Sequence, residues 1–423
     1  MAYGKFLSSA LKAVLQIPVE SQSSFDPQPF NETILLPPDV PITTDELDKK
    51  AVKVFEFLNA PESIVKIGND LYTSAMDGIY KVDCLRKHAS YCTHLPYHSA
   101  FLAWLRVCAV DTVTGKERKI YDGNADCKEF CSRPLGIRIH KRTMYCADLL
   151  KGLIEIDLET EKAKVLLPLG SSVGGLELFF PNDVAVDPER QLIYLSDSDT
   201  KRKWDYYMFS LLDFQNNSRI IQFNLTSGEA TIFADGLHFA NGIQISNDKK
   251  SLLVSEFTSR RVMRFPFGGS LPATGSLFSA YLPGNPDNIR PSKKGGYWVA
   301  LVGSRADGTR TLVEELQARP AVTKRILNWL VTAGTFLESV GVLSGNKALQ
   351  PTANELKNGN ILGSSIPASG AIAELDAEGK VLRVLHSTKF GDLSEILDDD
   401  GDLYIGTYLH QGLLKLPATA AHN

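Results

Sequence analysis

The chain has 423 residues, and 45 Lys and Arg against 49 Asp and Glu give a formal net charge of −4. This length allows either about three ordinary domains or one large barrel or propeller. The balanced charge argues against nucleic acid as the main partner, because no basic excess marks a polyanion-binding surface. Hydrophobic residues make up 43% and charged residues 22% of the chain, which excludes a disordered or collagen-like protein.

The N-terminal part of the chain predicts no membrane-spanning helix. Its apolar stretch, Phe6 to Val19, contains polar residues and is shorter than the ~20 apolar residues that a spanning helix needs. A surface amphipathic helix and a trimmed signal anchor or weak secretory signal both fit this stretch. Residues 20–50 are rich in Pro, Ser and acidic residues and predict an extended arm outside the core. We therefore expect an N-terminal segment and arm over residues 1–50, and the folded domain over residues 51–423.

Six cysteines and three glycosylation sequons favour the secretory route. Two local cysteine pairs each enclose a short polar stretch, which suits loop-closing disulfides better than zinc, because no C-x-x-C or His spacing accompanies them. These candidates are Cys84 with Cys92 and Cys127 with Cys131, and the sequons stand at Asn31, Asn216 and Asn224. We expect a glycoprotein that is membrane-associated, at the cell surface or extracellular.

From residue 60 onward one pattern recurs: a loop, a short β-branched strand, a turn with Gly, Asp or Asn, and a second strand centred on a large apolar residue. Clear copies begin at Pro181, Ala240 and Pro286, and weaker copies begin at Pro61, Pro134 and Leu393. The central residues Tyr145, Tyr194, Leu253 and Trp298 are 49, 59 and 45 residues apart, close to the ~40–50 residues of a four-stranded propeller unit. The repeat predicts an all-β fold, a six-bladed β-propeller whose blades pack radially into a ring.

The long gap between Trp298 and Tyr404 predicts an insertion in blade five. Apolar residues recur at helical spacing from Thr311 to Leu343, and Pro320 interrupts them. We expect a helical insertion at about residues 305–370. An amphipathic lid over a pocket and a membrane-facing surface helix fit the pattern equally well.

The residues that open the innermost strands are oxygen donors. In a propeller these strands run along the central channel, so the residue that opens each one points toward the axis. These residues are Glu62, Asn182, Asn241, Asp287 and Asn288. Turn chemistry explains any one of them alone, but two carboxylates with several amides are ligands of the kind that Ca²⁺ takes. Burying Glu62 and Asp287 on one axis without a cation would be costly, so the pattern predicts an axial Ca²⁺.

Several segments together resemble a known family. They are Pro-Asn-Asp-Val-Ala-Val-Asp (181–187), Phe-Ala-Asn-Gly-Ile-Gln-Ile-Ser (239–246), Val-Ser-Glu-Phe (254–257), Gly-Asn-Pro-Asp-Asn-Ile-Arg-Pro (284–291), Cys-Ser-Arg-Pro-Leu-Gly-Ile-Arg (131–138) and Asp-Gly-Asp-Leu-Tyr-Ile-Gly-Thr (400–407). From about residue 50 to the C-terminus, the chain resembles the strictosidine synthase-like branch of the paraoxonase and gluconolactonase superfamily. Within that branch it is similar to the animal plasma-membrane-associated members, including the insertion after Trp298.

The resemblance implies a calcium-dependent hydrolase of small hydrophobic esters or lactones, of the arylesterase type. The metal ligands would be Glu62, Asn182, Asn241, Asp287 and Asn288. The ester carbonyl would bind the open face of the ion, which stabilises the oxyanion as water attacks. Asp287 or a neighbour would orient or deprotonate that water, so Asp287 and Glu62 are the catalytic candidates.

The chain departs from the family pattern at positions that matter for chemistry. Leu135 and the Ala147-Asp148 region stand where paraoxonases carry their catalytic histidine pair, so a histidine mechanism is not available. Ser394 stands where plant strictosidine synthase places its catalytic glutamate, with Glu395 one place along, expected on the opposite strand face. Ser63 stands where paraoxonases have an Asp that holds a second, structural calcium, and this argues against a second site.

Two other functions therefore stay open. One is a non-catalytic membrane-associated scaffold or receptor that keeps the ion only to hold the blades together, which the missing histidine pair favours. The other is a condensing enzyme of the strictosidine synthase type, against which Ser394 argues. His238 and His410 fit either an acid or base at the channel mouth or ordinary surface residues.

Overall fold

The computed structural model describes residues 42–43, 45–68, 70–76, 78–83, 118–122, 132–280, 282–304, 311–365 and 369–417. Contacts divide the chain into two compact units. We call them the sheet unit, with described residues 42–204, 216–304 and 369–417, and the helical unit, with described residues 205–215 and 311–365.

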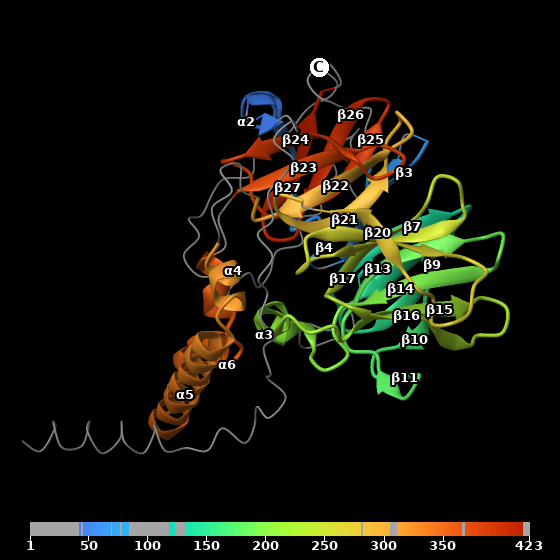
Figure 1. Ribbon diagram of the computed structural model, residues 1–423. Helices are drawn as coiled ribbons and strands as arrows, with labels where there is room; N and C mark the ends of the chain where they lie inside the picture. The colour runs from blue at the N-terminus through green and yellow to red at the C-terminus, as the bar shows by residue number, and fades with distance from the viewer. Residues whose placement is uncertain are drawn as a thin grey trace, which may run out of the picture. The chain divides into compact units, whose positions relative to one another are not determined.

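In its described residues, the sheet unit contains six sheets of four or five strands in chain order (Figure 1). The first three are β3 (Ile64–Ile67), β4 (Asp70–Ala75), β5 (Gly78–Asp83), β6 (Arg118–Tyr121); β7 (Pro134–His140), β8 (Thr143–Asp148), β9 (Gly152–Asp157), β10 (Ala163–Pro168); and β13 (Pro181–Asp187), β14 (Leu192–Asp197), β15 (Ser218–Asn224), β16 (Ala230–Leu237). A two-stranded ribbon of β11 (Ser172–Val173) and β12 (Leu176–Glu177) precedes the third.

The other three sheets include strands from the N-terminal side of the chain. They are β17 (Ala240–Ile245), β18 (Ser251–Glu256), β19 (Arg261–Pro266), β20 (Ser276–Ser279); β21 (Asn285–Pro291), β22 (Tyr297–Val302), β23 (Gly370–Leu375), β24 (Val381–Ser387), β1 (Ile42–Thr43); and β25 (Leu393–Asp399), β26 (Asp402–Thr407), β27 (Gln411–Leu416), β2 (Val52–Asn59). Strand pairing is antiparallel except between β1 and β24. The described chain is thus mostly β, as the repeat predicts.

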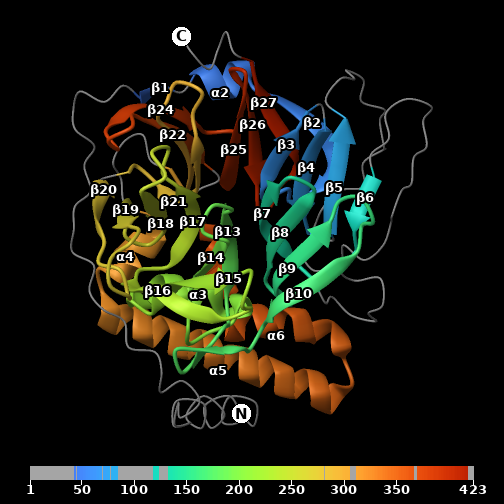
Figure 2. The ribbon, with the colours of Figure 1, turned by 90° about the vertical axis from the view of Figure 1, so that its right-hand side faces the viewer.

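The first strands of the sheets lie nearest one another, and the later strands lie toward the outside (Figure 2). In cyclic order, β3 contacts β7, β7 contacts β13, β13 contacts β17, β17 contacts β21, β21 contacts β25, and β25 contacts β3. The central strand β22 is apolar and buried along its whole length, because neighbouring sheets cover both of its faces. The outer strand β10 is largely exposed.

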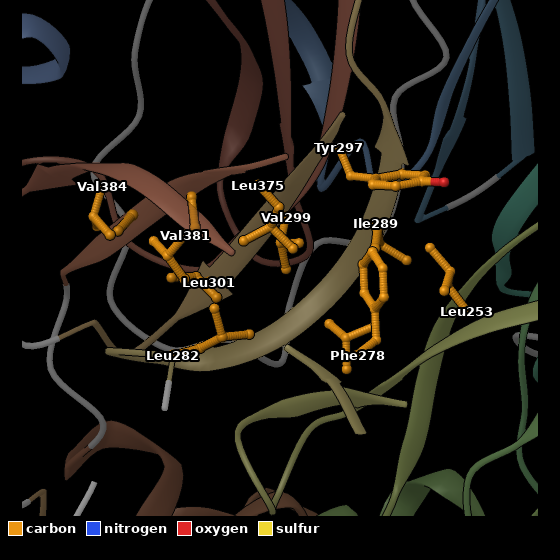
Figure 3. Close-up of a cluster of buried hydrophobic side chains, with 13 residues drawn as sticks. Leu253, Phe278, Leu282, Ile289, Tyr297, Val299, Leu301, Leu375, Val381 and Val384 are labelled. Carbon is orange, nitrogen blue, oxygen red and sulfur yellow. The ribbon is translucent and has the colours of Figure 1, made fainter. Parts of the chain in front are cut away.

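Apolar clusters fill the interfaces between consecutive sheets. One cluster joins the fourth and fifth sheets, where Leu253 and Phe278 pack with Tyr297 and Val299 (Figure 3). Another joins the sixth sheet to the first, through residues such as Leu413 and Leu71. Burying one such leucine contributes about 1.5–3 kcal/mol relative to leaving it exposed. These interfaces stabilise the arrangement in which the last sheet packs on the first.

The end of the predicted N-terminal arm belongs to the sheet unit. Ile42 in β1 pairs with Val384 in β24, and the short helix α2 (Asp45–Lys50) contacts the same strand. Leu47, on α2, is fully buried with Trp298. The expectation that all of residues 20–50 lie outside the core is therefore wrong for Leu47, because a single apolar side chain in a polar helix is enough to anchor it.

The helical unit contains α3 (Tyr207–Asp213), α4 (Leu312–Gln317), α5 (Pro320–Ser344) and α6 (Gln350–Lys357), with short 3-10 turns η3 (Lys347–Leu349) and η4 (Asn360–Ser365). Another 3-10 turn, η2 (Trp204–Tyr206), precedes α3. Thr311 and Glu314 form a capping box at the start of α4. Pro320 occupies the first turn of α5, and Gly345 ends that helix with a positive φ. Pro320 thus starts a helix instead of only breaking one.

Some predicted features lie outside the described residues. They are the Phe6–Val19 stretch, the cysteines Cys84, Cys92, Cys127 and Cys131, and the sequon at Asn31. Asn216 is exposed, whereas the Oδ1 atom of Asn224 accepts hydrogen bonds from the backbone of Thr226 and Ser227. Cys146 is a free, buried thiol, and burial raises its pKa, so it suits packing better than reaction.

Candidate metal centre

The predicted ligands lie at or just before the starts of first strands. Glu62 comes two residues before β3, and Asn182 and Asn241 are the second residues of β13 and β17. Asp287 and Asn288 are the third and fourth residues of β21. All five side chains belong to residues that are at most 6% exposed.

Local irregularities in strand pairing coincide with these residues. The pairing register shifts between Pro181 and Val184, between Ala240 and Ile243, and between Pro286 and Ile289. Each interval contains one or two predicted ligands. Such bulges re-aim side chains out of the regular alternation of a strand, and they are common next to functional sites.

Two glycines allow the first strands of neighbouring sheets to approach each other closely beside the predicted ligands. A Cβ atom on Gly242, next to Asn241, would come within 2.4 Å of the Asn288 Cα atom. A Cβ atom on Gly136 would come within 2.1 Å of Asp183 Oδ1. Only glycine fits at such a distance, so the backbones that carry the predicted ligands contact each other directly across neighbouring sheets.

Three of the predicted ligands carry a buried oxygen for which the described residues offer no hydrogen-bond partner. These atoms are Asn241 Oδ1, Asp287 Oδ1 and Asn288 Oδ1. Leaving a buried polar atom unsatisfied costs about 1–3 kcal/mol, so a group of three demands an explanation. A hard cation would satisfy all three, and carboxylate and amide oxygens are the donors that Ca²⁺ takes.

The donor set fits a calcium ion better than a zinc ion. Among the described residues, no group of three or more His, Cys, Asp or Glu side chains is placed to hold a metal. A metal centre formed by the predicted residues would use amide oxygens together with Glu62 and Asp287, which is chemistry typical of Ca²⁺. The residues present fit the implied ion.

The two carboxylates lie in an environment that disfavours their negative charge. Burial raises the pKa of Glu62 to about 7, against the opposing effect of Arg133, whose Nη2 atom lies 3.5 Å from Glu62 Oε2. Burial also raises the pKa of Asp287 well above its usual range, and the negative charges of Glu62 and Glu395 add to the effect. A bound divalent cation would compensate these charges.

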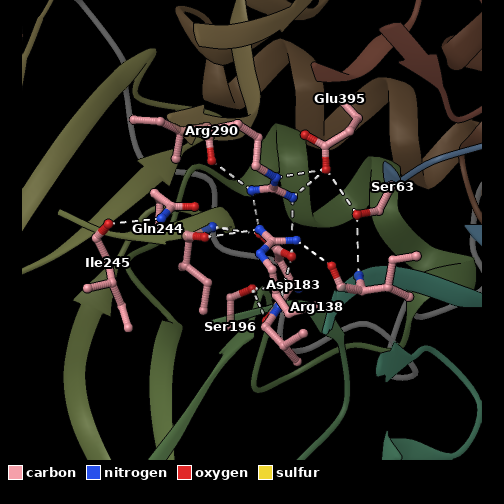
Figure 4. A network of polar contacts seen from close by, with 12 residues as sticks. Ser63, Arg138, Asp183, Ser196, Gln244, Ile245, Arg290 and Glu395 are labelled. Carbon is pink, nitrogen blue, oxygen red and sulfur yellow. Dashed lines mark hydrogen bonds and ion pairs between the residues drawn. The ribbon is translucent and has the colours of Figure 1, made fainter. Parts of the chain in front are cut away.

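An ion-pair network lies among the inner strands beside this set (Figure 4). Arg290 donates to Glu395 Oε2 and, at 3.1 Å, to Asp183 Oδ2. Arg138 donates to Asp183 Oδ2 at 3.2 Å, and Ser63 donates to Glu395 Oε2 at 2.9 Å. The side chains of Asp183 and Glu395 are fully buried. Two guanidinium groups thus supply positive charge at Asp183. Ser63, which stands where the resemblance places an Asp ligand of a second calcium ion, belongs to the same network.

Sequence reasoning missed Arg138, Arg290 and Glu395 as members of this network. A usable signal was present, because the repeated openings Pro134-Leu-Gly-Ile-Arg138 and Pro286-Asp-Asn-Ile-Arg290 place an arginine at the same position of two first strands. Charged residues at equivalent places in buried strands indicate paired burial. Ser394, next to Glu395, donates to the Glu62 carbonyl at 3.0 Å.

The two histidines that fit an acid or base at the channel mouth, His238 and His410, have different contacts. His410 is half exposed, and its Nε2 atom lies 3.0 Å from Asp392 Oδ2. The backbone N–H of His238 donates to Glu256 Oε1 at 2.9 Å. Leu135 and Ala147, which the family resemblance places where paraoxonases carry histidines, are buried apolar residues.

Comparisons with known proteins agree with the motif pattern. The model of a family described as strictosidine synthase matches residues 182–269, which contain Asn182 and Asn241. The adipocyte plasma membrane-associated protein of Rattus norvegicus is 27% identical over 414 residues, which are 95% of this chain and 94% of the relative. The protein strictosidine synthase-like 10 of Arabidopsis thaliana is 30% identical over 293 residues, which are 67% of this chain and 69% of the relative.

Solved structures that match most of the chain have low sequence identity to it. A gluconolactonase from Xanthomonas campestris has 12% identity and a TM-score of 0.49, over 92% of this chain and 99% of that chain. A regucalcin from Agrobacterium tumefaciens, described as a calcium-binding protein, has 10% identity and a TM-score of 0.49, over 89% of this chain and 95% of that chain.

Proposed function

Because the chain belongs to the strictosidine synthase family, we propose that it is a calcium-dependent hydrolase of small hydrophobic esters or lactones. The observation that carries this proposal is a group of three buried oxygens, on Asn241, Asp287 and Asn288, that have no hydrogen-bond partner among the described residues. A bound cation would give all three oxygens a partner, whether it acts in catalysis or only in stability. The hydrolysis experiment below separates these two roles.

The proposed architecture is a closed six-bladed propeller. The cyclic contacts between first strands and the apolar clusters between consecutive sheets support it. The propeller would extend over residues 51–423 together with β1 and α2, and the insertion between β22 and β23 would occupy about residues 305–370.

The proposed ligands are Glu62, Asn182, Asn241, Asp287 and Asn288. When bound, calcium would act as a Lewis acid that polarises the substrate carbonyl and stabilises the oxyanion. The Asp287 carboxylate would also accept a hydrogen bond from the attacking water, take up its proton, and return that proton to the leaving oxygen as the acyl C–O bond of the substrate breaks. Arg133 would favour the ionised form of Glu62, because its guanidinium is the nearest opposing charge.

Hydrolysis of phenyl acetate and of a γ-lactone by the purified full chain tests this proposal. We expect activity that a chelator abolishes, that added Ca²⁺ restores, and that Asp287→Ala removes. The control Glu159→Gln changes an exposed carboxylate and should keep full activity. Hydrolysis that persists after complete calcium removal would contradict the proposal.

A non-catalytic scaffold or receptor is the second candidate, and a specific observation favours it. Leu135 and Ala147 put buried apolar side chains where paraoxonases carry histidines. In that case chelation would lower the melting temperature, but neither ester nor lactone would be hydrolysed at any calcium concentration.

We also propose that the chain is membrane-associated and reaches the secretory route. Its relatives include proteins named for association with the adipocyte plasma membrane. The exposed sequon at Asn216 suits glycosylation in that compartment. A glycosidase-sensitive shift in the mass of the protein secreted or retained by animal cells would test the route.

A further inference from the structure

The long helix α5 carries an exposed apolar stripe. Val322, Trp329, Phe336 and Leu343 are spaced seven residues apart, so they fall on one face of the helix. Their exposed fractions lie between 44% and 88%. Val340, four residues after Phe336, is exposed on the same face. A contiguous row of large exposed apolar side chains marks an interaction surface.

The opposite face of α5 packs within the helical unit. Gly334 is buried there, and a Cβ atom on it would lie 2.6 Å from the carbonyl oxygen of Ala353 in α6. Glu338 accepts a hydrogen bond from Lys357 of α6 at 2.8 Å. The helix therefore has one face fixed by α6, and the apolar stripe lies on the other side.

The charges on α5 suit an anionic surface. Glu338 is the single acidic residue of α5, and it is paired on the α6 face. Arg325 falls within the stripe, between Val322 and Trp329, and its neighbour Lys324 is also exposed. Basic residues beside a stripe that contains an exposed tryptophan are typical of helices that bind at the level of lipid headgroups.

The topology of the insertion excludes a membrane crossing by α5. In the described chain, α5 is the one helix long and apolar enough to cross a membrane. However, the chain leaves the fifth sheet at Val302 and returns to it at Gly370, and these two residues pair directly. If α5 crossed the membrane, the chain would have to cross it a second time to return to the fifth sheet. The helix that follows, α6, has 8 residues and is too short to span a membrane.

We propose that α5 lies along the surface of an anionic lipid bilayer, with the stripe from Val322 to Leu343 inserted at headgroup depth. This inference rests on the proposed membrane association but not on the proposed hydrolysis. The bilayer contact would add to any contact made by other parts of the chain.

Vesicle sedimentation of the full chain provides the first test. We expect binding to phosphatidylcholine vesicles that contain phosphatidylserine, and binding weakened about tenfold by the double variant Trp329→Ser/Phe336→Ser. The matched control Leu176→Ser/Leu277→Ser removes two apolar side chains of similar exposure from the sheet unit and should bind like the wild type. Lys324→Glu/Arg325→Glu should reduce the increase in binding that phosphatidylserine causes. The control Lys162→Glu/Lys164→Glu makes the same charge change on exposed residues of the sheet unit and should not reduce it.

Quenching of tryptophan fluorescence by brominated lipids provides a second test, in which the difference between the wild type and Trp329→Phe reports on α5. Lipids brominated near the headgroup should quench wild-type fluorescence more than lipids brominated near the chain end, and Trp329→Phe should remove that difference. Quenching unchanged in Trp329→Phe, or stronger quenching from the chain end, would overturn the proposal. So would a stripe variant that keeps full vesicle binding but changes from a dimer to a monomer, as measured by light scattering, because the stripe would then bind a second copy.

Hydrolysis of a soluble ester, measured on the same variants, should be unchanged, which separates this proposal from the proposed function.

Discussion

Arg290 and Glu395, 105 residues apart in the chain, form a two-point ion pair: Nε donates at 2.9 Å and Nη2 at 2.5 Å to the same Oε2 atom. Both side chains are almost completely buried. Arg290 also bonds Asp183, so one guanidinium compensates two buried carboxylates. Its removal would leave Glu395 without its main opposing charge and Asp183 with Arg138 as its remaining ion-pair partner in the described chain.

We expect Arg290→Met to lower the free energy of unfolding by about 3–5 kcal/mol, because uncompensated buried charges are strongly destabilising. Urea unfolding followed by circular dichroism measures this loss. Arg142→Met is the control, because Arg142 and Glu159 form an exposed pair at 2.5 Å whose removal should cost at most about 1 kcal/mol. Equal losses in the two variants would show that Arg290 makes no special contribution.

Gly242→Ala should destabilise the fold and weaken calcium binding. The new Cβ atom would lie 2.4 Å from the Asn288 Cα atom and 2.6 Å from the Asp287 carbonyl oxygen, so β21 would have to move. Such overpacking costs about 1–3 kcal/mol. Gly269→Ala, at a position with no atom within 4 Å of the added Cβ, should leave both properties unchanged. Calcium titration followed by thermal melting measures both effects, and wild-type calcium affinity in Gly242→Ala would contradict the expected position of the site.

Calcium should raise the melting temperature of the wild-type chain, and a chelator should lower it. A ligand at about 100 times its Kd stabilises by about 2.7 kcal/mol. Asn288→Ala should remove most of this calcium-dependent shift. Glu62→Gln, which keeps an oxygen but removes a charge, should weaken calcium binding, whereas the exposed Glu159→Gln should not. Metal analysis of the purified protein should find calcium in the wild type and little in Asn288→Ala.

Ionisation of the Asp197 carboxyl group should lower the free energy of unfolding of the protein as the pH rises. Burial raises the pKa of Asp197 to about 6 from 3.8, although Arg219 opposes this shift. Because the folded-state pKa is the higher one, this contribution is fully present below about pH 3.8 and is lost as the pH rises through about 6. The free energy of unfolding of the wild type, measured against that of Asp197→Asn, should therefore fall over this range. A difference that rises or stays constant would refute the assignment.

The repeated strand pattern, the family and the oxygen donors could be predicted from the sequence, because each of these is a local pattern. Asn241 and Asp287 were predictable as oxygen donors from their places at strand starts, and the family membership drawn from the motifs is confirmed by the comparisons. Their role in binding metal stays a prediction. The partners of Arg290 were not predictable, since Asp183 and Glu395 lie 107 and 105 residues away in the chain. Leu47 was missed because its surroundings in the sequence are polar.

The sixth sheet joins β2, from the N-terminal side of the described chain, to β27 near its C-terminal end, with Val52 opposite Lys415. A nascent polypeptide emerging from the ribosome therefore exposes an unpaired β2 until β27 has been synthesised. During that interval β2 offers a free edge for aggregation or for a chaperone. Translation speed and chaperone supply should consequently affect the yield of this protein more than that of a chain whose sheets each close locally.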